Sequence, residues 1–242
     1  MYQTLIKPAV ADIKKFVLDT LFPISCLSCG AEGAFICADC KSAIRPLEHQ
    51  RCIVCQKPTP FGFTHSGCLT PFGADGLICF YNYHDEKVAK LIIGGKYHFL
   101  PGVYEILGAM IAQKLTEQYH NILISNNIYT LCPVPLHSSR HRWRGFNQAE
   151  ILCKAIGKEL GFATASVLVR CKYTRTQKDL KKDQRQKNVA DAFKLRPKMD
   201  ICGKNFILVD DVTTTGATLK QAAMVLKRNG AAKVFCLAVA RD

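Results

Sequence analysis

The sequence predicts an α/β domain built on a parallel sheet with helices on both faces, preceded by a small metal-binding module. Short, fully apolar segments alternate with helical patterns after residue 72, which is typical of strands that are buried on both faces. Seven of the 13 cysteines fall between residues 26 and 68. The length of 242 residues fits one medium domain and a small one, and 48% hydrophobic with 21% charged residues is a globular composition.

The charge of the chain favours anionic partners. Its 33 Lys and Arg residues against 19 Asp and Glu residues give a net charge of +14, which attracts nucleotides, diphosphates, nucleic acid or an acidic membrane surface. No stretch reaches the roughly 18 uninterrupted apolar residues of a spanning helix, and no signal peptide precedes the cysteines. We therefore expect a cytoplasmic protein without a transmembrane span, in which paired cysteines hold metal rather than form disulfides.

Residues 1–22 are expected to form an amphipathic N-terminal helix. Apolar residues recur there at three- to four-residue steps, and Pro23 ends the pattern. Such a helix either packs on the rest of the protein or contacts a membrane surface or a partner, so peripheral membrane contact stays open.

Residues 23–72 hold four pairs of possible metal ligands, each pair separated by two residues. A CxxC turn delivers two soft ligands from one tight loop, and zinc requires four ligands in a tetrahedron. A segment with so few large apolar side chains needs such metal ions in order to fold. His65 is the weakest candidate, because a lone histidine beside such a turn can simply face solvent. We predict one zinc site at Cys26, Cys29, Cys37 and Cys40, and a second at Cys52, Cys55, His65 and Cys68.

Residues 73–242 are expected to form the α/β domain. Apolar residues at helical spacing indicate its helices, two of which are closed by Gly161 and Gly230. Continuous apolar runs indicate its strands. The expected helices span residues 85–93, 103–115, 148–160 and 218–229. The expected strands span 206–209 and 234–240, and residues 129–135 are expected to be a strand that runs into a loop.

An acidic pair and a loop rich in threonine and glycine follow the strand at 206–209. This is the carboxyl end of a strand in an open sheet, where ligands bind. The loop can offer backbone N–H groups and hydroxyls to a phosphate at a helix N-terminus, while Asp210 and Asp211 can accept hydrogen bonds from vicinal hydroxyls. The pattern fits a sugar 5-phosphate; a plain helix cap or a magnesium-binding acidic pair is the alternative. The predicted phosphate contacts are Thr213, Thr214, Thr215, Gly216, Ala217 and Thr218.

The segment 209–218 closely resembles the phosphoribosyl diphosphate signature of the type I phosphoribosyltransferases. Earlier in the chain come the cysteine pairs, then Pro-Val-Pro at 133–135, then Arg-Gly-Phe-Asn-Gln at 144–148. In this order the motifs resemble the ComF family of competence and DNA-utilisation proteins from about residue 22 onward. The resemblance implies a double zinc ribbon at 23–72, a type I phosphoribosyltransferase-like domain at 73–242, and a role in DNA uptake, natural transformation or DNA utilisation. His65 departs from the family's usual cysteine, which weakens the second zinc site.

Two basic segments accompany the loop. Residues 137–144 read as a basic loop whose arginines can hold a diphosphate by bidentate contacts. Residues 170–187 carry eight Lys and Arg residues, which fits a lid over the ligand, a single-stranded DNA contact or a solvated basic face. The predicted diphosphate, lid or DNA contacts are Lys96, Arg140, Arg142, Arg144, Arg170, Gln177, Arg185 and Asn188.

The resemblance also implies a mechanism if the domain is catalytic. Mg²⁺ would bridge the ribose hydroxyls and the diphosphate, with Asp210 and Asp211 as the catalytic residues. Diphosphate would leave against Lys96 or the arginines, so that positioning and charge neutralisation supply the catalysis. Thr214 stands where hypoxanthine-type relatives have an aspartate, which disfavours purine salvage.

Three functions remain open from the sequence. The favoured one is a protein that binds phosphoribosyl diphosphate or a related sugar phosphate and serves DNA uptake, with single-stranded DNA and uptake-machinery proteins as partners. The second is a metabolic phosphoribosyltransferase with an unknown acceptor. The third is a non-catalytic DNA-binding adaptor. The fold alone does not establish turnover.

Overall fold

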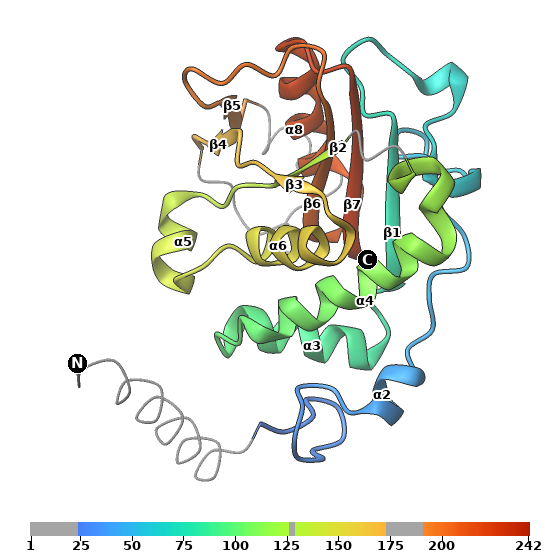
Figure 1. The fold of residues 1–242 in the computed structure, drawn as a ribbon, viewed down its shortest axis with the longest axis vertical. Coiled ribbons are helices and arrows are strands. Elements are labelled where there is room, and N and C mark those ends of the chain that lie inside the picture. Colours follow the sequence, from blue (N-terminus) through green and yellow to red (C-terminus); the bar gives the residue numbers. More distant parts are fainter. Residues whose placement is uncertain (1–23, 126–128, 173–190) are drawn as a thin grey trace, which may run out of the picture.

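The computed structural model describes residues 24–125, 129–172 and 191–242 (Figure 1). Its centre is a five-stranded sheet in which every pair of neighbouring strands is parallel. The predicted fold class, a parallel α/β sheet behind a cysteine-rich module, is confirmed. The strands lie in the order β1 (Gly76–Asn82), β7 (Lys233–Arg241), β6 (Asn205–Thr213), β2 (Tyr129–Pro133) and β3 (Ala163–Thr164).

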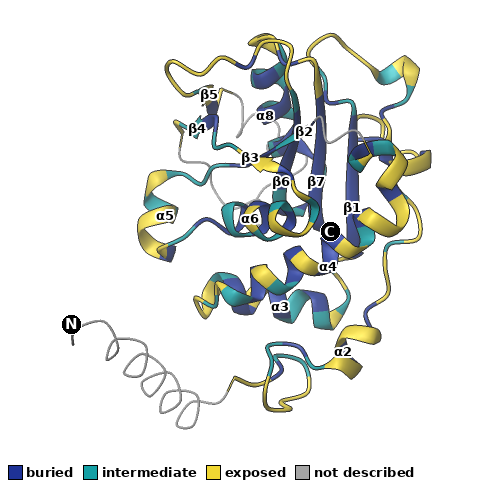
Figure 2. Ribbon diagram, viewed as in Figure 1, coloured by how far each residue is buried: buried dark blue, intermediate teal, exposed yellow. Residues whose placement is uncertain are grey.

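Helices cover both faces of the sheet, and the three central strands are almost wholly buried between them (Figure 2). One face packs against α3 (Glu86–Tyr97), α4 (Gly102–Tyr119) and α6 (Gln148–Leu160), through side chains such as Leu91, Ile111 and Leu152. The other face packs against α8 (Ala217–Arg228), through Leu219 and Leu226. This double coverage explains why the strands carry continuous apolar runs rather than alternating ones.

Local caps fix where the helices begin and end. Asp85 accepts hydrogen bonds from the backbone N–H groups of Lys87 and Val88 and so starts α3. Helix α3 then runs past the predicted end at residue 93 to Tyr97, which matters because Lys96 lies in this added turn. Gly161 closes α6 in a left-handed conformation with φ 72°, as predicted.

Helix α5 (Ser138–Arg144) corrects the prediction of a basic loop at 137–144. The His137 side chain accepts a hydrogen bond from Ser139 N and caps the helix start. Gly145 closes it with φ 81°. A helix of only seven residues is too short to show the apolar periodicity that predicts longer helices.

Strand β6 is longer than predicted, and this moves the acidic pair. The sequence suggested a strand at 206–209 followed by a loop, but the strand runs to Thr213. Its pairing with β7 continues from Asp210 opposite Ala238 to Thr213 opposite Arg241. Asp210 and Asp211 therefore lie on a rigid strand rather than in the loop, and the alternation of a strand turns their side chains to opposite faces.

The remaining described elements are short. Strands β4 (Leu168–Arg170) and β5 (Phe193–Leu195) form an antiparallel pair beside the main sheet. A π-helical turn (His120–Ile124) follows α4. The cysteine-rich segment contains α2 (Ala38–Ser42) and two 3₁₀ turns, Pro60–Gly62 and Ser66–Cys68.

Both halves of the cysteine-rich segment pack on the α/β domain. In the first half, Leu27 lies so close to Gly94 of α3 that a Cβ there would come within 2.6 Å of its side chain. In the second half, the Phe63 ring meets the Phe235 ring at 5.6 Å between centroids. The predicted boundaries at residues 22/23 and 72/73 stay predictions, and the expected N-terminal helix lies outside the described residues. Within the described ranges, none of the helices has the length and apolar character needed to cross a membrane.

Candidate functional site

Asp211 is the fixed point of the candidate site. It is buried at the carboxyl end of β6, on the face that α3 and α6 cover. Lys96 Nζ of α3 lies 2.8 Å from its Oδ2, and Gln148 Nε2 of α6 donates to the same oxygen at 3.0 Å. The other oxygen accepts a 2.7 Å hydrogen bond from Val212 N. These contacts hold one carboxylate in a single orientation.

Asp210, the other member of the acidic pair, has a raised pKa. Burial raises its pKa from 3.8 to about 7, and the charge of Asp211 adds to this effect, while Lys96 and Arg170 act in the other direction. Its Oδ1 accepts a 2.9 Å hydrogen bond from Asp211 N. Direct partners thus hold Asp211, while the pKa of Asp210 lies near 7, so Asp210 can ionise beside a cation or a hydrogen-bond donor.

The loop after β6 has the geometry of an anion site. Gly216 adopts φ 73° immediately before α8, which favours glycine and directs the helix N-terminus toward the loop. The Thr215 hydroxyl oxygen is buried and has no hydrogen-bond partner among the described residues. Buried polar atoms normally find a partner, so this hydroxyl fits a phosphate oxygen.

The second half of the cysteine-rich segment touches the loop directly. A Cβ on Gly216 would lie 2.9 Å from Cγ1 of Ile53, which sits between the metal-ligand candidates Cys52 and Cys55 and is fully buried. Position 216 therefore requires glycine for two reasons, its positive φ and its close contact with Ile53. The cysteine-rich module forms part of the support of the loop.

The Arg-Gly-Phe-Asn-Gln motif at 144–148 positions the site from α5 and α6. Asn147 caps α6 through Ala149 N and donates to Val134 O at 3.1 Å, which ties the Pro-Val-Pro segment to the helix start. Gln148 then reaches Asp211, and its own Oε1 is buried without a partner among the described residues. Gln148 stood in the motif but carried no predicted role; only the fold reveals it.

The predicted cationic residues gather around the acidic pair to different degrees. Burial and the charge of Arg140 lower the pKa of Arg170 to about 10, while Asp210 acts against them. Arg144 is buried, and its Nε has no hydrogen-bond partner in the described part of the chain. Arg142 is exposed on α5. Crowded cations such as Arg140 and Arg170 favour an anion between them.

Three of the predicted site residues cannot be placed in this arrangement. Gln177, Arg185 and Asn188 lie outside the described residues, as does most of the predicted lid at 170–187. Lys96 was predicted to face a leaving diphosphate, and the structure instead pairs it with Asp211. Its ammonium group can still contact an anion on its other side, because one-fifth of the side chain is exposed.

The eight predicted zinc ligands form two clusters in the predicted pairing. Within each cluster the ligand atoms all lie within 4.8 Å of one another, which suits a tetrahedral ion with Zn–S distances of about 2.3 Å. In the first cluster Cys29 Sγ and Cys37 Sγ are 3.6 Å apart. The clusters and the zinc-ribbon match reported below support zinc as the metal of both sites.

His65 fits the second cluster better than the sequence suggested. Its Nδ1 lies 3.2 Å from Cys55 Sγ, and its Nε2 lies 3.1 Å from Pro58 O. A carbonyl oxygen only accepts, so this contact requires the proton on Nε2, and Nδ1 would then be the atom that binds a zinc ion.

The thiols of this cluster carry the electrostatic signature of a metal site. Burial acts to raise the pKa of Cys52, but backbone N–H groups of Cys55, His65 and Val54 outweigh it and lower that pKa to about 6. Burial and the neighbouring Cys55 and Cys52 groups raise the pKa of Cys68 to about 11. Ligands this close can all ionise only beside a cation.

Comparison with known proteins agrees with both parts of the chain. It matches the Double zinc ribbon domain over residues 17–79 and the Phosphoribosyl transferase domain over residues 146–242. The DNA utilization protein YhgH of Salmonella typhi is 43% identical over 107 residues, which cover 43% of this chain and 46% of YhgH, so the match spans about half of that relative.

A second relative is similar over most of its length. Competence protein F of Haemophilus influenzae is 26% identical over 211 residues, covering 85% of this chain and 90% of that protein. Among solved structures, an allosteric regulatory enzyme of purine biosynthesis shares 20% identity at a TM-score of 0.36, over 56% of this chain and 25% of that one. The predicted resemblance in sequence is confirmed by the domain matches and the named relatives.

Proposed function

We propose that this chain, which joins a double zinc ribbon to a phosphoribosyltransferase domain and has competence protein F and YhgH among its homologues, binds phosphoribosyl diphosphate with Mg²⁺ and acts in the uptake or use of DNA. The observation that carries the proposal is the acidic pair at the end of β6, directly followed by a glycine-capped helix N-terminus. A sugar phosphate carries a phosphate group and two vicinal hydroxyls a few bonds apart. The helix N-terminus suits the phosphate group, and the acidic pair suits the hydroxyls.

The loop would hold the 5-phosphate. Backbone N–H groups at the start of α8 supply donors there, together with the Thr215 hydroxyl, which has no hydrogen-bond partner among the described residues. Asp210 and Asp211 would accept hydrogen bonds from the ribose hydroxyls at the next position along β6. Asp210, whose pKa is about 7 in the free protein, would lose its proton as the ligand binds.

Cationic side chains would hold the diphosphate. Lys96 pairs with Asp211, and Arg144 lies close enough to the buried Tyr104 to oppose the rise in its pKa that burial and Asp211 cause. Mg²⁺, when bound with the ligand, would neutralise part of the diphosphate charge and keep most of its contacts to water and ligand oxygens. The protein's own part is orientation and charge stabilisation, which needs no nucleophilic side chain.

An aromatic ledge beside the site would supply the DNA contact. Tyr97, Phe99 and Trp143 are 48%, 45% and 55% exposed, respectively. The Trp143 ring lies 6.1 Å from Tyr97 and 5.2 Å from Phe99 between centroids. Exposed aromatic faces next to arginines are how single-stranded nucleic acid is bound without sequence preference.

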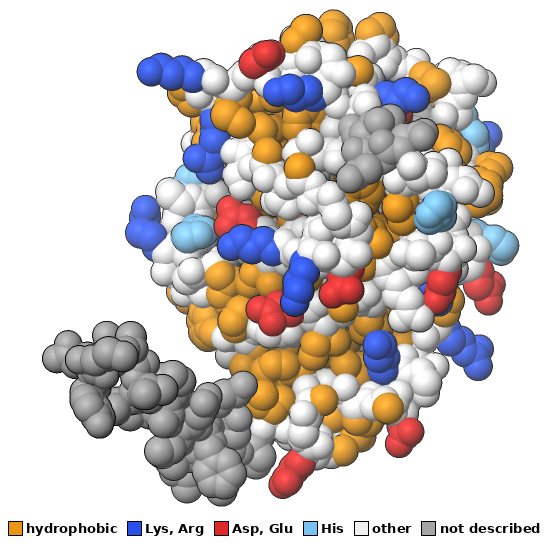
Figure 3. Space-filling model, viewed as in Figure 1, with side chains coloured by type: hydrophobic (Ala, Val, Ile, Leu, Met, Phe, Trp, Pro, Cys, Tyr) orange, Lys and Arg blue, Asp and Glu red, His pale blue; other side chains and the backbone are white. Residues whose placement is uncertain are grey.

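The distribution of charge fits a local rather than a general DNA surface. On the face shown in Figure 3, Lys and Arg side chains are spread singly, with Asp and Glu between them. The net charge of +14 therefore does not form one continuous patch on this face. The ledge and the adjacent α5, with Arg140 and Arg142, are the better candidate.

The experiment titrates phosphoribosyl diphosphate with Mg²⁺, and separately a single-stranded oligothymidine, against wild type and the double variant Asp210→Ala/Asp211→Ala. We expect the variant to lose sugar-phosphate binding and to keep DNA binding, which would indicate two distinct sites. Absence of sugar-phosphate binding by the wild-type protein would refute both the proposal and a conventional transferase, and leave the DNA-binding adaptor. Turnover is tested by diphosphate release with single-stranded DNA or nucleobases present.

A further inference from the structure

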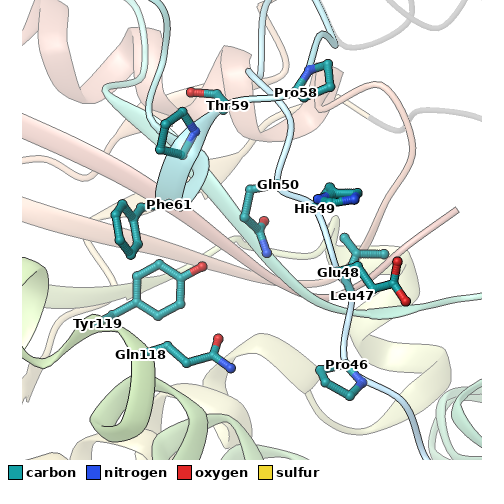
Figure 4. Close-up of a pocket in the computed structure, with 11 residues that line it drawn as sticks. Pro46, Leu47, Glu48, His49, Gln50, Pro58, Thr59, Phe61, Gln118 and Tyr119 are labelled. Carbon is teal, nitrogen blue, oxygen red and sulfur yellow. The ribbon is translucent and has the colours of Figure 1, made fainter.

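A cavity of about 770 Å³ lies beside β1, between the end of α4 and the cysteine-rich segment (Figure 4). Its walls come from residues 46–50 and 58–61 of that segment and from Gln118 and Tyr119 of α4. β1 is an outer strand of the sheet, whereas the acidic pair lies on β6. None of the described residues that line the cavity belongs to the acidic pair or to the loop after β6, so the cavity is separate from the candidate site.

Backbone contacts hold the wall that the cysteine-rich segment supplies. The Gln50 side chain donates to Cys79 O at 2.7 Å and accepts from Cys79 N at 2.9 Å, so it takes the place of a neighbouring strand at this point of β1. Thr59 N donates to Gln50 O at 3.0 Å and closes residues 50–59, the hairpin of the second zinc site. Because both ends of this wall are fixed, the cavity is formed before any ligand binds.

Tyr119 places a buried hydroxyl against this cavity. Only 3% of the residue is exposed, because its ring packs edge to face against Phe61 and Phe80 at 6.1 and 6.3 Å between centroids. Figure 4 shows the hydroxyl directed toward the cavity, and it has no hydrogen-bond partner within residues 24–125, 129–172 and 191–242. Burial and Cys79 raise the pKa of Tyr119 to about 12, so the hydroxyl keeps its proton at neutral pH. Buried hydroxyls normally have a partner, so this one indicates a ligand.

The lining favours a flat, uncharged group over an anion. Of the described residues that line the cavity, none is Lys or Arg, although the net charge of the chain is +14. A phosphate or carboxylate inside would therefore lack the cation that such groups require when they are buried. Phe61 is 49% exposed, which leaves part of its ring open to stacking. The cavity thus combines an aromatic wall with polar groups that can both donate and accept.

We propose that this cavity binds a nucleobase, stacked on Phe61 and hydrogen-bonded at its edge by Tyr119 and Gln118. A base has a flat apolar face and a row of donors and acceptors along its edge. The Tyr119 hydroxyl and the Gln118 amide, which Figure 4 shows on the same side of the cavity, match such an edge. The site stands without the proposed phosphoribosyl function, because the two share no lining residue.

The base belongs either to a free nucleoside or to a DNA strand. A nucleoside needs nothing beyond the cavity. A strand also needs cations for its phosphates outside the cavity, and Arg45 and Arg51, which flank residues 46–50, are exposed there. Both sources use the same contacts of the base, so one set of variants tests them together.

The test titrates the four deoxynucleosides separately into the full chain with zinc bound, by calorimetry and without phosphoribosyl diphosphate. Tyr119→Phe removes the hydroxyl and keeps the ring. Its matched control is Tyr129→Phe, because Tyr129 is also buried, at 5% exposed, but lies on β2 and outside the lining. We expect wild type and Tyr129→Phe to bind at least one nucleoside equally. Binding should be about three- to tenfold weaker in Tyr119→Phe and at least about fivefold weaker in Phe61→Ala.

A homo-oligonucleotide of the base that binds identifies the source. If the strand enters the cavity, Tyr119→Phe weakens its binding too; if only nucleoside binding weakens, the ligand is a free nucleoside. Melting temperature and zinc content verify that each variant is folded, and Tyr119→Phe alone decides the test if Phe61→Ala is not.

Three results would overturn the proposal. These are no nucleoside binding by wild type, unchanged binding in Tyr119→Phe, and an equal loss in Tyr129→Phe. Loss of nucleoside binding in Trp143→Ala but not in Tyr119→Phe would also overturn it, because the base would then bind on the aromatic ledge. Failure of phosphoribosyl diphosphate to bind would refute the proposed function alone, since that ligand is absent from these titrations.

Discussion

Replacing Asp210 by Asn should stabilise the free protein, whereas the same change at Asp211 should destabilise it. The pKa of Asp210 is raised from 3.8 to about 7 by burial and by Asp211. A carboxyl whose pKa is raised in the folded protein costs stability once it ionises in the unfolded chain. The stability that the protonated carboxyl contributes is fully present below about pH 4, where both the folded and the unfolded protein carry the proton. It is lost as the pH rises to about 7, because the unfolded chain ionises first.

The magnitude follows from the two pKa values. Their difference corresponds to about 4 kcal/mol above neutrality at 1.36 kcal/mol per pH unit. Linkage places about 1 kcal/mol of this difference between about pH 6 and about pH 8. An Asn side chain also loses hydration on burial. We therefore expect Asp210→Asn to raise the free energy of unfolding by about 1 to 2 kcal/mol at about pH 8. Asp211→Asn leaves Lys96 without its ion-pair partner, which should cost about 1 to 3 kcal/mol.

The assay is urea unfolding at about pH 6 and about pH 8, without Mg²⁺ or sugar phosphate, with zinc content checked in each sample. Glu159→Gln, an exposed substitution on α6, controls for the removal of one negative charge. The advantage of Asp210→Asn should grow with pH. Equal effects of the two Asn substitutions, or an advantage that does not depend on pH, would contradict the raised pKa of Asp210 and the stabilising ion pair of Asp211.

Three further predictions address the zinc ribbons and the aromatic ledge. Cys55→Ser should lose one zinc ion and weaken phosphoribosyl diphosphate binding, because the second ribbon supports the loop. Cys29→Ser should lose one zinc ion and keep its affinity for phosphoribosyl diphosphate. Equal losses of this affinity in the two variants would contradict the prediction. Trp143→Ala should weaken oligothymidine binding by about 1 to 3 kcal/mol, and Phe72→Ala, another exposed aromatic change, should not. His65→Cys should retain two zinc ions per chain and His65→Ala one, measured by a colorimetric chelator; two ions in His65→Ala would exclude it as a ligand.

The parts that the sequence predicts well are those set by local spacing. The zinc ligands come as pairs within tight turns, and the loop at 213–218 comes as one continuous segment, so their chemistry can be inferred without the fold. The end of β6 was predicted wrongly because Asp210 and Asp211 look like loop residues. Hydrogen bonds to β7, a strand that follows them in the chain, extend the sheet through both.

The parts that the sequence misses depend on contacts between distant segments. Gln148 reaches Asp211 across 63 residues, and no local pattern signals that contact. Arg241 follows an apolar run at the end of β7, where an arginine is expected to face solvent, yet only 9% of it is exposed. Helix α5 was predicted as a loop because its capping residues, His137 and Gly145, determine it more than apolar spacing does.

The central claim is that the loop after β6 and its acidic pair bind a phosphoribosyl group, and a crystal structure with phosphoribosyl diphosphate and Mg²⁺ tests it most directly. The account predicts the 5-phosphate against Thr215 and the backbone N–H groups at the start of α8, with the ribose hydroxyls on Asp210 and Asp211. A ligand bound elsewhere, with the loop and the acidic pair left free at saturating concentration, would contradict it.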